Sequence, residues 1–341
     1  MRRTVSNDRQ IVRKVSEYML ADNSLAGKKD SFFTKTIVVW FGALICCALW
    51  GSAFPCIKLG YGWFEIAAED TMTQMLFAGI RFALAGVMAI VIGSIAQRRF
   101  IYPKKKTWFR VAKLSSLQTI AQYVFFYIGL AHTTGVKASI VEGVNVFVAI
   151  LVASLIFRME KLTAKKIIGS IIGFAGVVLV NLSGTNASLS FNLLGDGFIF
   201  LSTVAYAFSS VLLKRYSKED DPIVLSGYQF VFGGAVMAAV GVIFGGRLTE
   251  ISTKGILMLI YLAFVSAVAY SLWGILVKYN PISKVAVFGF MNPVFGVILS
   301  AILLPEASAL GVMSLVSLAL ICAGIFIVNY EKEKQNEGSK H

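Results

Sequence analysis

Residues 50–58 read Trp-Gly-Ser-Ala-Phe-Pro-Cys-Ile-Lys, and residues 206–214 read Tyr-Ala-Phe-Ser-Ser-Val-Leu-Leu-Lys. Each stretch runs from an aromatic residue to a lysine in eight steps. Further matches follow in the same order along the chain. Arg81-Phe82 matches Gln229-Phe230, and residues 176–181 match residues 324–329. Between them, Tyr123, Lys137 and Asn145 match Tyr270, Lys284 and Asn292 at one constant offset of 147. Because several matches keep their order, we infer that the second half of the chain repeats the first.

The composition places both halves in a membrane. Of the 341 residues, 57% are hydrophobic and 15% are charged, and the mean hydropathy is +0.75. Soluble domains carry about 25% charged residues, so this chain has too few to cover a water-exposed surface. These values exclude an ordinary soluble enzyme or nucleic-acid-binding module, and they indicate a polytopic membrane protein.

Ten apolar runs are long enough to be spanning helices, which need about 20 residues each. They lie near Thr36–Gly60, Met72–Ala96, Val111–Ala131, Ala138–Phe157, Ile167–Leu182, Leu194–Leu213, Ile223–Phe244, Gly255–Val277, Val285–Leu304 and Leu310–Tyr330. The sequence therefore predicts an all-α protein with two five-helix units, residues 36–183 and 194–330. Polar tails, residues 1–35 and 331–341, flank these units.

The basic residues predict the orientation. If the first tail lies in the cytoplasm and the loops alternate, all but five of the 32 lysines and arginines fall on the cytoplasmic side. The exceptions are Lys58, Lys137, Arg247 and Lys254 outside, and Arg81 within a span. Positive residues concentrate on the cytoplasmic side of membrane proteins. Both termini are therefore expected in the cytoplasm, and the net charge of +14 reflects orientation rather than nucleic-acid binding.

An odd number of spans per unit means that the two units enter the membrane from opposite sides. They therefore form an inverted-topology repeat, which is typical of secondary transporters with one central site exposed alternately to each face. The expected partners are a small-molecule substrate and the lipid bilayer.

With these residues in view, the chain resembles the EamA-type transporters of the drug/metabolite transporter superfamily over nearly all of residues 37–330. The likeness is carried by Trp50-Gly51 with Lys58, Arg81-Phe82, Asn292-Pro293-Val-Phe, Glu160, Glu306 and the glycine-rich fifth and tenth spans. The resemblance implies ten helices around a central cavity, alternating access, and export of amino acids or other small metabolites across the plasma membrane. The fourth span departs from the pattern, because Val146 stands where the ninth has Pro293, and any local helix break is therefore expected in the second half alone.

Arg81 and Glu142 are the clearest charges inside predicted spans. At 1.5 Å per residue they lie roughly 12 Å and roughly 7–8 Å below the outer face, so their side chains could meet. Ionisable groups at membrane depth usually face a cavity or a partner. Two interpretations of the pair stay open: a structural ion pair, or two groups that hold the zwitterionic head of a substrate. Glu142 could also carry a coupled proton.

Aromatic and amide side chains within the spans are expected to line the cavity, since small-molecule pockets are mostly apolar with a few orienting polar groups. With the two charges, the predicted substrate-binding residues are Trp50, Arg81, Gln122, Tyr123, Phe126, Tyr127, Glu142, Asn145, Tyr206, Tyr270, Trp273 and Asn292. Gln118 is a further candidate. Buried Asn and Gln also join helices to one another, and this packing interpretation stays open for each amide.

Other functions are weighed against transport of a neutral or zwitterionic solute. A sugar or nucleotide-sugar carrier is the alternative among transporters; a membrane-embedded lipid-modifying enzyme and a channel are the alternatives from other classes. The chain has no P-loop motif, and His132 and His341 are its only histidines, so no cofactor or histidine-based metal site is expected. The glycine pattern Gly169-Ser-Ile-Ile-Gly173 permits packing within the chain or formation of a homodimer.

Overall fold

A computed structural model describes residues 32–67, 69–133, 138, 141–182, 192–303 and 312–330. Within these ranges the structure consists of helices, turns and short irregular segments, with no strand. Most of the first tail, residues 1–31, lies outside the described residues. Residues 331–341, Lys137 and Glu306 also lie outside them.

The first half contains α2 (Thr36–Trp63), α3 (Thr71–Ala96), α4 (Thr107–Leu114), η1 (Ser115–Ala121), α5 (Gln122–Ala131), α7 (Asn145–Leu151), η2 (Val152–Ile156) and α8 (Ala164–Leu182). The second half contains η3 (Leu193–Gly197), α9 (Phe198–Tyr216), α10 (Pro222–Ile243), α11 (Thr253–Tyr279), α12 (Ile282–Ala286), η4 (Val287–Phe290), α13 (Met291–Leu303) and α14 (Val312–Asn329). These bounds agree with the apolar runs to within a few residues.

Helix starts follow from local capping residues. Asp70 accepts a hydrogen bond from the backbone N–H of Thr73 at the start of α3, and Ser252 accepts one from Gly255 at the start of α11. Asp221 caps α10, whose first residue is Pro222. A side-chain oxygen at the capping position accepts from one of the N–H groups that a helix N-terminus leaves unpaired. Proline fits at the first helical position because it has no backbone N–H to leave unpaired there.

Five helices within the described ranges are long and apolar enough to cross a membrane. They are α2, α3, α10, α11 and the continuous stretch Leu193–Tyr216. Large apolar side chains on their outer faces are exposed, including Ile37, Phe41, Ile95, Phe232 and Leu257. Exposed apolar surface on this scale marks contact with lipid or another apolar partner. The chain is therefore a multi-pass helical membrane protein.

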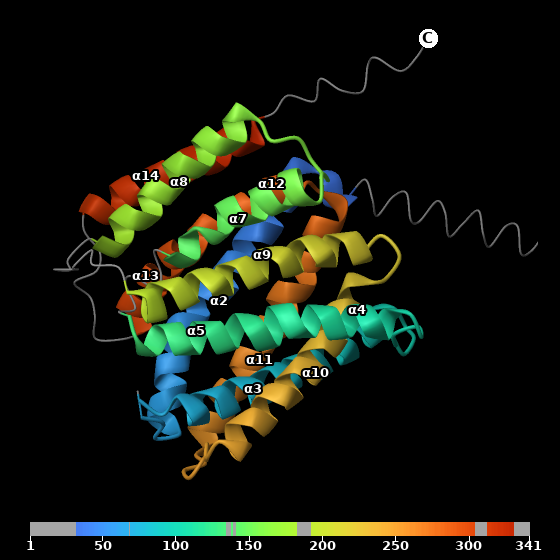
Figure 1. Cartoon of the computed structure of the whole chain (residues 1–341), viewed down its shortest axis with the longest axis vertical. Coiled ribbons are helices and arrows are strands. Elements are labelled where there is room, and N and C mark those ends of the chain that lie inside the picture. Colours follow the sequence, from blue (N-terminus) through green and yellow to red (C-terminus); the bar gives the residue numbers. More distant parts are fainter. Residues whose placement is uncertain are drawn as a thin grey trace, which may run out of the picture.

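Helices at equivalent positions of the two halves pack against one another (Figure 1). The pair α8 and α14 lies at one end of the long axis of the molecule, and the pair α3 and α10 lies toward the other end. Both crossings depend on glycine: a Cβ added to Gly79 would lie 2.3 Å from the backbone nitrogen of Ala238, and one added to Gly324 would lie 2.5 Å from the carbonyl oxygen of Gly169. Only glycine allows these backbones to come so close.

The glycine pattern of α8 is used within the chain. Gly169 and Gly176 meet the backbone of α14, and Gly173 meets the ring of Phe290. Of the two interpretations of this pattern, the structure supports packing inside the molecule.

Candidate functional site

A cavity of about 220 Å³ lies between α2, α3, α5, α7, α9, α11 and α13. The structure brings together on its walls all twelve residues that were predicted to bind substrate: Trp50, Arg81, Gln122, Tyr123, Phe126, Tyr127, Glu142, Asn145, Tyr206, Tyr270, Trp273 and Asn292. These residues come from both halves of the chain. The cavity is therefore shared by the two repeats.

One wall is a cluster of aromatic rings. The ring of Trp50 on α2 meets Tyr270 and Trp273 on α11 edge to face, with centroid distances of 5.0 and 5.1 Å. Such pairs stabilise one another beyond the apolar area that they bury. Because these rings are held by one another, the cavity has a preformed apolar surface.

Equivalent residues of the two halves meet beside this wall. The hydroxyl oxygens of Tyr123 and Tyr270 lie 3.4 Å apart, and the rings of Phe82 and Phe230 stack with centroids 5.3 Å apart. The ring of Phe82 packs against Tyr123 at 4.6 Å, and that of Phe230 packs against Tyr270 at 4.8 Å. The same contact is thus made twice, once in each half, as expected where two repeats face each other.

Arg81 on α3 is a buried cation. Its side chain is 6% exposed, and its Cζ atom lies 4.3 Å from the centroid of the Phe82 ring. Within the described residues its Nε atom has no hydrogen-bond partner. It is also the one basic side chain among the described residues that line the cavity.

Glu142 lies at the start of the apolar helical stretch Val141–Ile156 and is the one acidic group among the described lining residues. Arg81 and Glu142 are both described, and no ion pair within 4.0 Å joins them. Of the two interpretations of these charges, the structural ion pair is therefore not what the structure contains. A guanidinium and a carboxyl group instead face one cavity without a direct contact.

Several polar atoms at the cavity are buried without a partner in the described part of the chain. They are Nε1 of Trp50, Oε1 of Gln122 and the Oδ1 atoms of Asn145 and Asn292. Buried polar groups are almost always hydrogen-bonded, so each exception needs an explanation. A polar ligand, or water that it replaces, would supply the missing partners.

Gln118 behaves differently and shows what a packing role looks like. It is 3% exposed, and its Oε1 atom accepts a hydrogen bond of 3.2 Å from Nε2 of Gln229 on α10. Thr119 completes the arrangement by donating to Oε1 of Gln229 at 2.8 Å. Gln118 is absent from the described cavity lining, and it joins α10 to η1 instead.

The helices are irregular next to the cavity. The π-helical segment η1 ends at Ala121, directly before Gln122, and the 3-10 segment η4 ends two residues before Asn292. In the first half a turn at Val144 interrupts the helix before Asn145. A break confined to the second half was expected because Val146 replaces proline, and this expectation is wrong. The turn at Val144 and the segment η4 lie at nearly equivalent places in the two halves, whereas η1 corresponds to regular helix within α11.

Four small polar residues that were not predicted from the sequence also line the cavity: Ser202, Thr203, Ser210 and Ser266. Ser202 and Ser210 lie four residues before and after Tyr206, so they share its helix face. This spacing is the signal that could have found them. Serine and threonine are common inside membrane helices, which is why the signal is weak.

The remaining histidine and cysteines lie apart from the cavity. His132 is exposed, and its Nδ1 atom lies 2.8 Å from the carbonyl oxygen of Ile128, as expected for an interfacial residue. The thiols of Cys46 and Cys47 are buried and donate to the carbonyls of Ala269 and Phe288. These contacts pack α2 against the second half.

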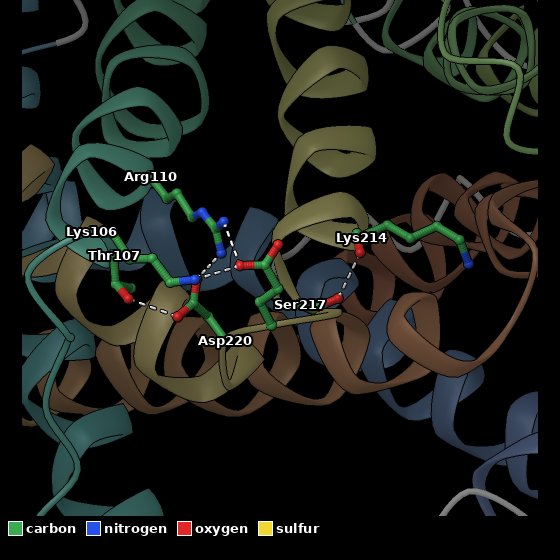
Figure 2. Close-up of polar contacts among 7 residues, drawn as sticks. Lys106, Thr107, Arg110, Lys214, Ser217 and Asp220 are labelled. Carbon is green, nitrogen blue, oxygen red and sulfur yellow. Dashed lines mark hydrogen bonds and ion pairs between the residues drawn. The ribbon is translucent and has the colours of Figure 1, made fainter.

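A second polar cluster joins α4 to the connection between α9 and α10 (Figure 2). Lys106 and Arg110 form ion pairs with Glu219, Arg110 also pairs with Asp220, and Thr107 donates a hydrogen bond of 2.6 Å to Asp220. The two cations lower the pKa of Glu219 to about 2. This cluster links the first half of the chain to the second at a place away from the cavity.

Known proteins resemble the chain along most of its length. A family model described as the EamA-like transporter family matches it twice, over residues 37–182 and 193–330. A chloroplastic WAT1-related protein of Arabidopsis thaliana is 27% identical, with 86% of this chain and 70% of the relative aligned. An uncharacterized transporter of Bacillus subtilis is 27% identical over 83% of this chain and 92% of its own length.

A protein of Salmonella typhimurium named "Probable amino-acid metabolite efflux pump" is 26% identical over 84% of this chain and 93% of its own. A solved crystal structure aligns with a TM-score of 0.70 at 15% identity, covering 85% of this chain and 95% of its own. At that identity the structural likeness bears on the fold alone.

Proposed function

The chain belongs to the EamA-like transporter family, and on this premise we propose that it is a secondary transporter of amino acids or similar small neutral or zwitterionic metabolites, working in the direction of export. That the chain is a membrane transporter rather than an enzyme agrees with the names of its relatives. The observation that carries the choice of solute is the shared cavity, with its aromatic walls, one cation and one anion.

The proposed architecture is ten spanning helices in two inverted five-helix repeats, residues 36–183 and 194–330. Two matches of one family model, each covering one half, support the repeat. The uneven distribution of lysine and arginine supports cytoplasmic termini, with the tails at residues 1–35 and 331–341 on that side. The proposed location is the plasma membrane.

Alternating access follows from this architecture. Two similar halves of opposite orientation can exchange conformations at little net cost in free energy, so that a cavity between them faces each side in turn. Equivalent residues that touch at the cavity, such as Tyr123 and Tyr270, support this mechanism because the repeats then move about a shared contact. No ATP-binding motif is present in the sequence, so the proposed driving force is a solute or ion gradient.

A nucleotide-sugar or phosphorylated substrate fits the cavity less well. Such anions need several cationic groups, and Arg81 is the single basic group among the described lining residues. Glu142 on the same cavity would repel a phosphate. A free sugar remains the second candidate, since aromatic faces and unpaired amides such as Asn145 also suit a neutral polyol.

Uptake into proteoliposomes that contain the purified chain tests the proposal. A panel of labelled amino acids and other small metabolites would be offered with and without an imposed pH gradient. Saturable uptake of one or more amino acids above the level of protein-free liposomes is expected. Uptake of a sugar with no amino acid carried would overturn the proposed solute, and no saturable uptake of any solute would overturn the transport function.

A further inference from the structure

The cavity contains two kinds of residue with respect to the repeat. Tyr123 and Tyr270, like Asn145 and Asn292, are identical residues at equivalent positions. The two charges break this symmetry. Arg81 corresponds to Gln229, and Glu142 corresponds at the offset of 147 to Gly289. The repeat itself accounts for residues that both halves share, whereas the unshared charges need a separate explanation.

Gln229 shows how the second repeat uses the position of Arg81. It is 1% exposed, and both polar atoms of its amide are satisfied, one by Thr119 and the other by Gln118. Its carbonyl oxygen also accepts a hydrogen bond of 2.9 Å from Ser115. The residue holds α10 against η1. A structural role at this position therefore produces a fully hydrogen-bonded side chain.

Arg81 has none of these features. It is nearly as buried, but its Nε atom lacks a hydrogen-bond partner within the described chain, and its guanidinium lies over the face of the Phe82 ring. An arginine in a membrane interior is costly unless it faces a cavity, a partner or both. Here the cavity is present, and no carboxylate of the described residues forms an ion pair with Arg81. The missing partner of Arg81 is therefore an anionic group that enters the cavity.

Glu142 provides the opposite charge without reaching Arg81. Gly289, at the equivalent position, also lines the cavity but adds no side chain. The cavity thus has one guanidinium and one carboxyl group, held apart. A solute with a single charge would leave one of these groups uncompensated, whereas a solute with both charges would satisfy each.

We propose that Arg81 and Glu142 determine the class and orientation of the substrate: a zwitterion whose carboxylate binds Arg81 and whose ammonium group binds Glu142. The inference rests on the proposed transport function and narrows its solute to molecules that carry both charges. Asn145 and Asn292, whose Oδ1 atoms lack partners in the described part, add acceptors for the ammonium group. The aromatic wall around Trp50 contacts the remainder of the solute.

Matched ligands test this orientation on the purified full-length chain in nanodiscs. Isothermal titration calorimetry would compare L-leucine, L-threonine and L-phenylalanine with the decarboxylated amine and the deaminated acid of each. In the wild type, the zwitterion of at least one set is expected to bind about tenfold or more tightly than either relative, the range given by a hydrogen bond to a charged group.

Variants assign each charge to its end of the solute. Arg81→Gln introduces the side chain that Gln229 has at the equivalent position of the second repeat. This variant is expected to bind the zwitterion and the decarboxylated amine with the same affinity. Glu142→Gln is expected to bind the zwitterion and the deaminated acid with the same affinity. Arg81→Lys keeps the positive charge, so it is expected to keep part of the preference for the zwitterion. Arg215→Gln and Glu250→Gln make the same charge changes at exposed positions and serve as controls. A monodisperse elution profile shows that each variant is folded.

The outcomes separate this inference from the transport function. Equal binding of zwitterion and amine by the wild type, or a preference that survives in Arg81→Gln, overturns the assignment of Arg81. Equal binding of the zwitterion and the deaminated acid by the wild type, or a preference for the zwitterion over that acid that survives in Glu142→Gln, overturns the assignment of Glu142. If no zwitterion binds while proteoliposomes still carry an uncharged sugar, the inference fails and transport stands.

Discussion

Asn145, Asn292 and Gln118 are buried amides in apolar helices, yet their surroundings differ. The Oδ1 atoms of both asparagines lack partners within the described residues, whereas Gln118 is bonded to Gln229. The sequence places all three inside spans but does not distinguish them, because hydrogen bonding depends on which helices become neighbours. The twelve predicted lining residues could be found because aromatic and polar groups stand out in an apolar segment.

This difference predicts opposite effects of two substitutions. Gln118→Ala leaves the buried Nε2 of Gln229 unpaired, which is expected to cost about 1–3 kcal/mol and to lower the melting temperature in detergent. Transport by the protein that remains folded should be little affected. Asn292→Ala removes an oxygen that has no partner in the described chain, so the melting temperature should hardly change while uptake falls. Thermal unfolding and proteoliposome uptake measured on both variants check the prediction, and the reverse pattern would contradict it.

At the scale of helices, close crossings and irregular segments are set by tertiary contacts. The π-helical segment η1 has the sequence Ser-Ser-Leu-Gln-Thr-Ile-Ala, which contains no proline or glycine that would announce it. Its Ser115 donates to the carbonyl of Gln229, and a Cβ on Gly233 would lie 2.6 Å from Ser115 Oγ. The lengths and ends of α3, α10 and α11 were predictable from apolar runs and capping residues. The irregular segments were not, because they depend on a partner helix that is far away in the sequence.

The crossing of α3 and α10 predicts a strong effect of adding one methyl group. Gly79→Ala places a Cβ 2.3 Å from a backbone nitrogen of α10, and backbone atoms cannot move aside as a side chain would. Overpacking of this kind is expected to destabilise the fold by about 1–3 kcal/mol or more. Gly62→Ala is the control, since no heavy atom lies within 4 Å of its added Cβ. Equal melting temperatures of the two variants in detergent would contradict the close crossing.

The ion-pair cluster at α4 predicts a pH dependence. The pKa of Glu219 is lowered to about 2 by Lys106 and Arg110, from about 4.3 in an unfolded chain. A lowered folded pKa means that the pair stabilises the protein fully above about pH 4.3 and that this contribution is lost as the pH falls toward 2. Glu219→Gln should therefore flatten the dependence of melting temperature on pH in that window. The difference in melting temperature between this variant and the wild type should become smaller as the pH falls toward 2. An unchanged pH profile would show that the pair contributes nothing to stability.

At the scale of the whole molecule, two similar halves surround one cavity and share its walls. Paired contacts of equivalent residues, Tyr123 with Tyr270 and Phe82 with Phe230, agree with this arrangement. The repeat could be predicted from the sequence because its motifs keep their order and spacing. The separation of Arg81 from Glu142 could not, since depth along a helix does not determine which faces of two helices meet.

Counterflow exchange tests the central claim, that one cavity between the repeats carries solute by alternating access. Proteoliposomes would be loaded with a high concentration of an unlabelled amino acid that the chain carries, then diluted into buffer with a trace of the labelled compound. Alternating access predicts a transient accumulation of label above equilibrium, reduced in Arg81→Gln and retained in Arg215→Gln. Label that only equilibrates, with no overshoot at any preload, would show a channel-like pathway and contradict the account.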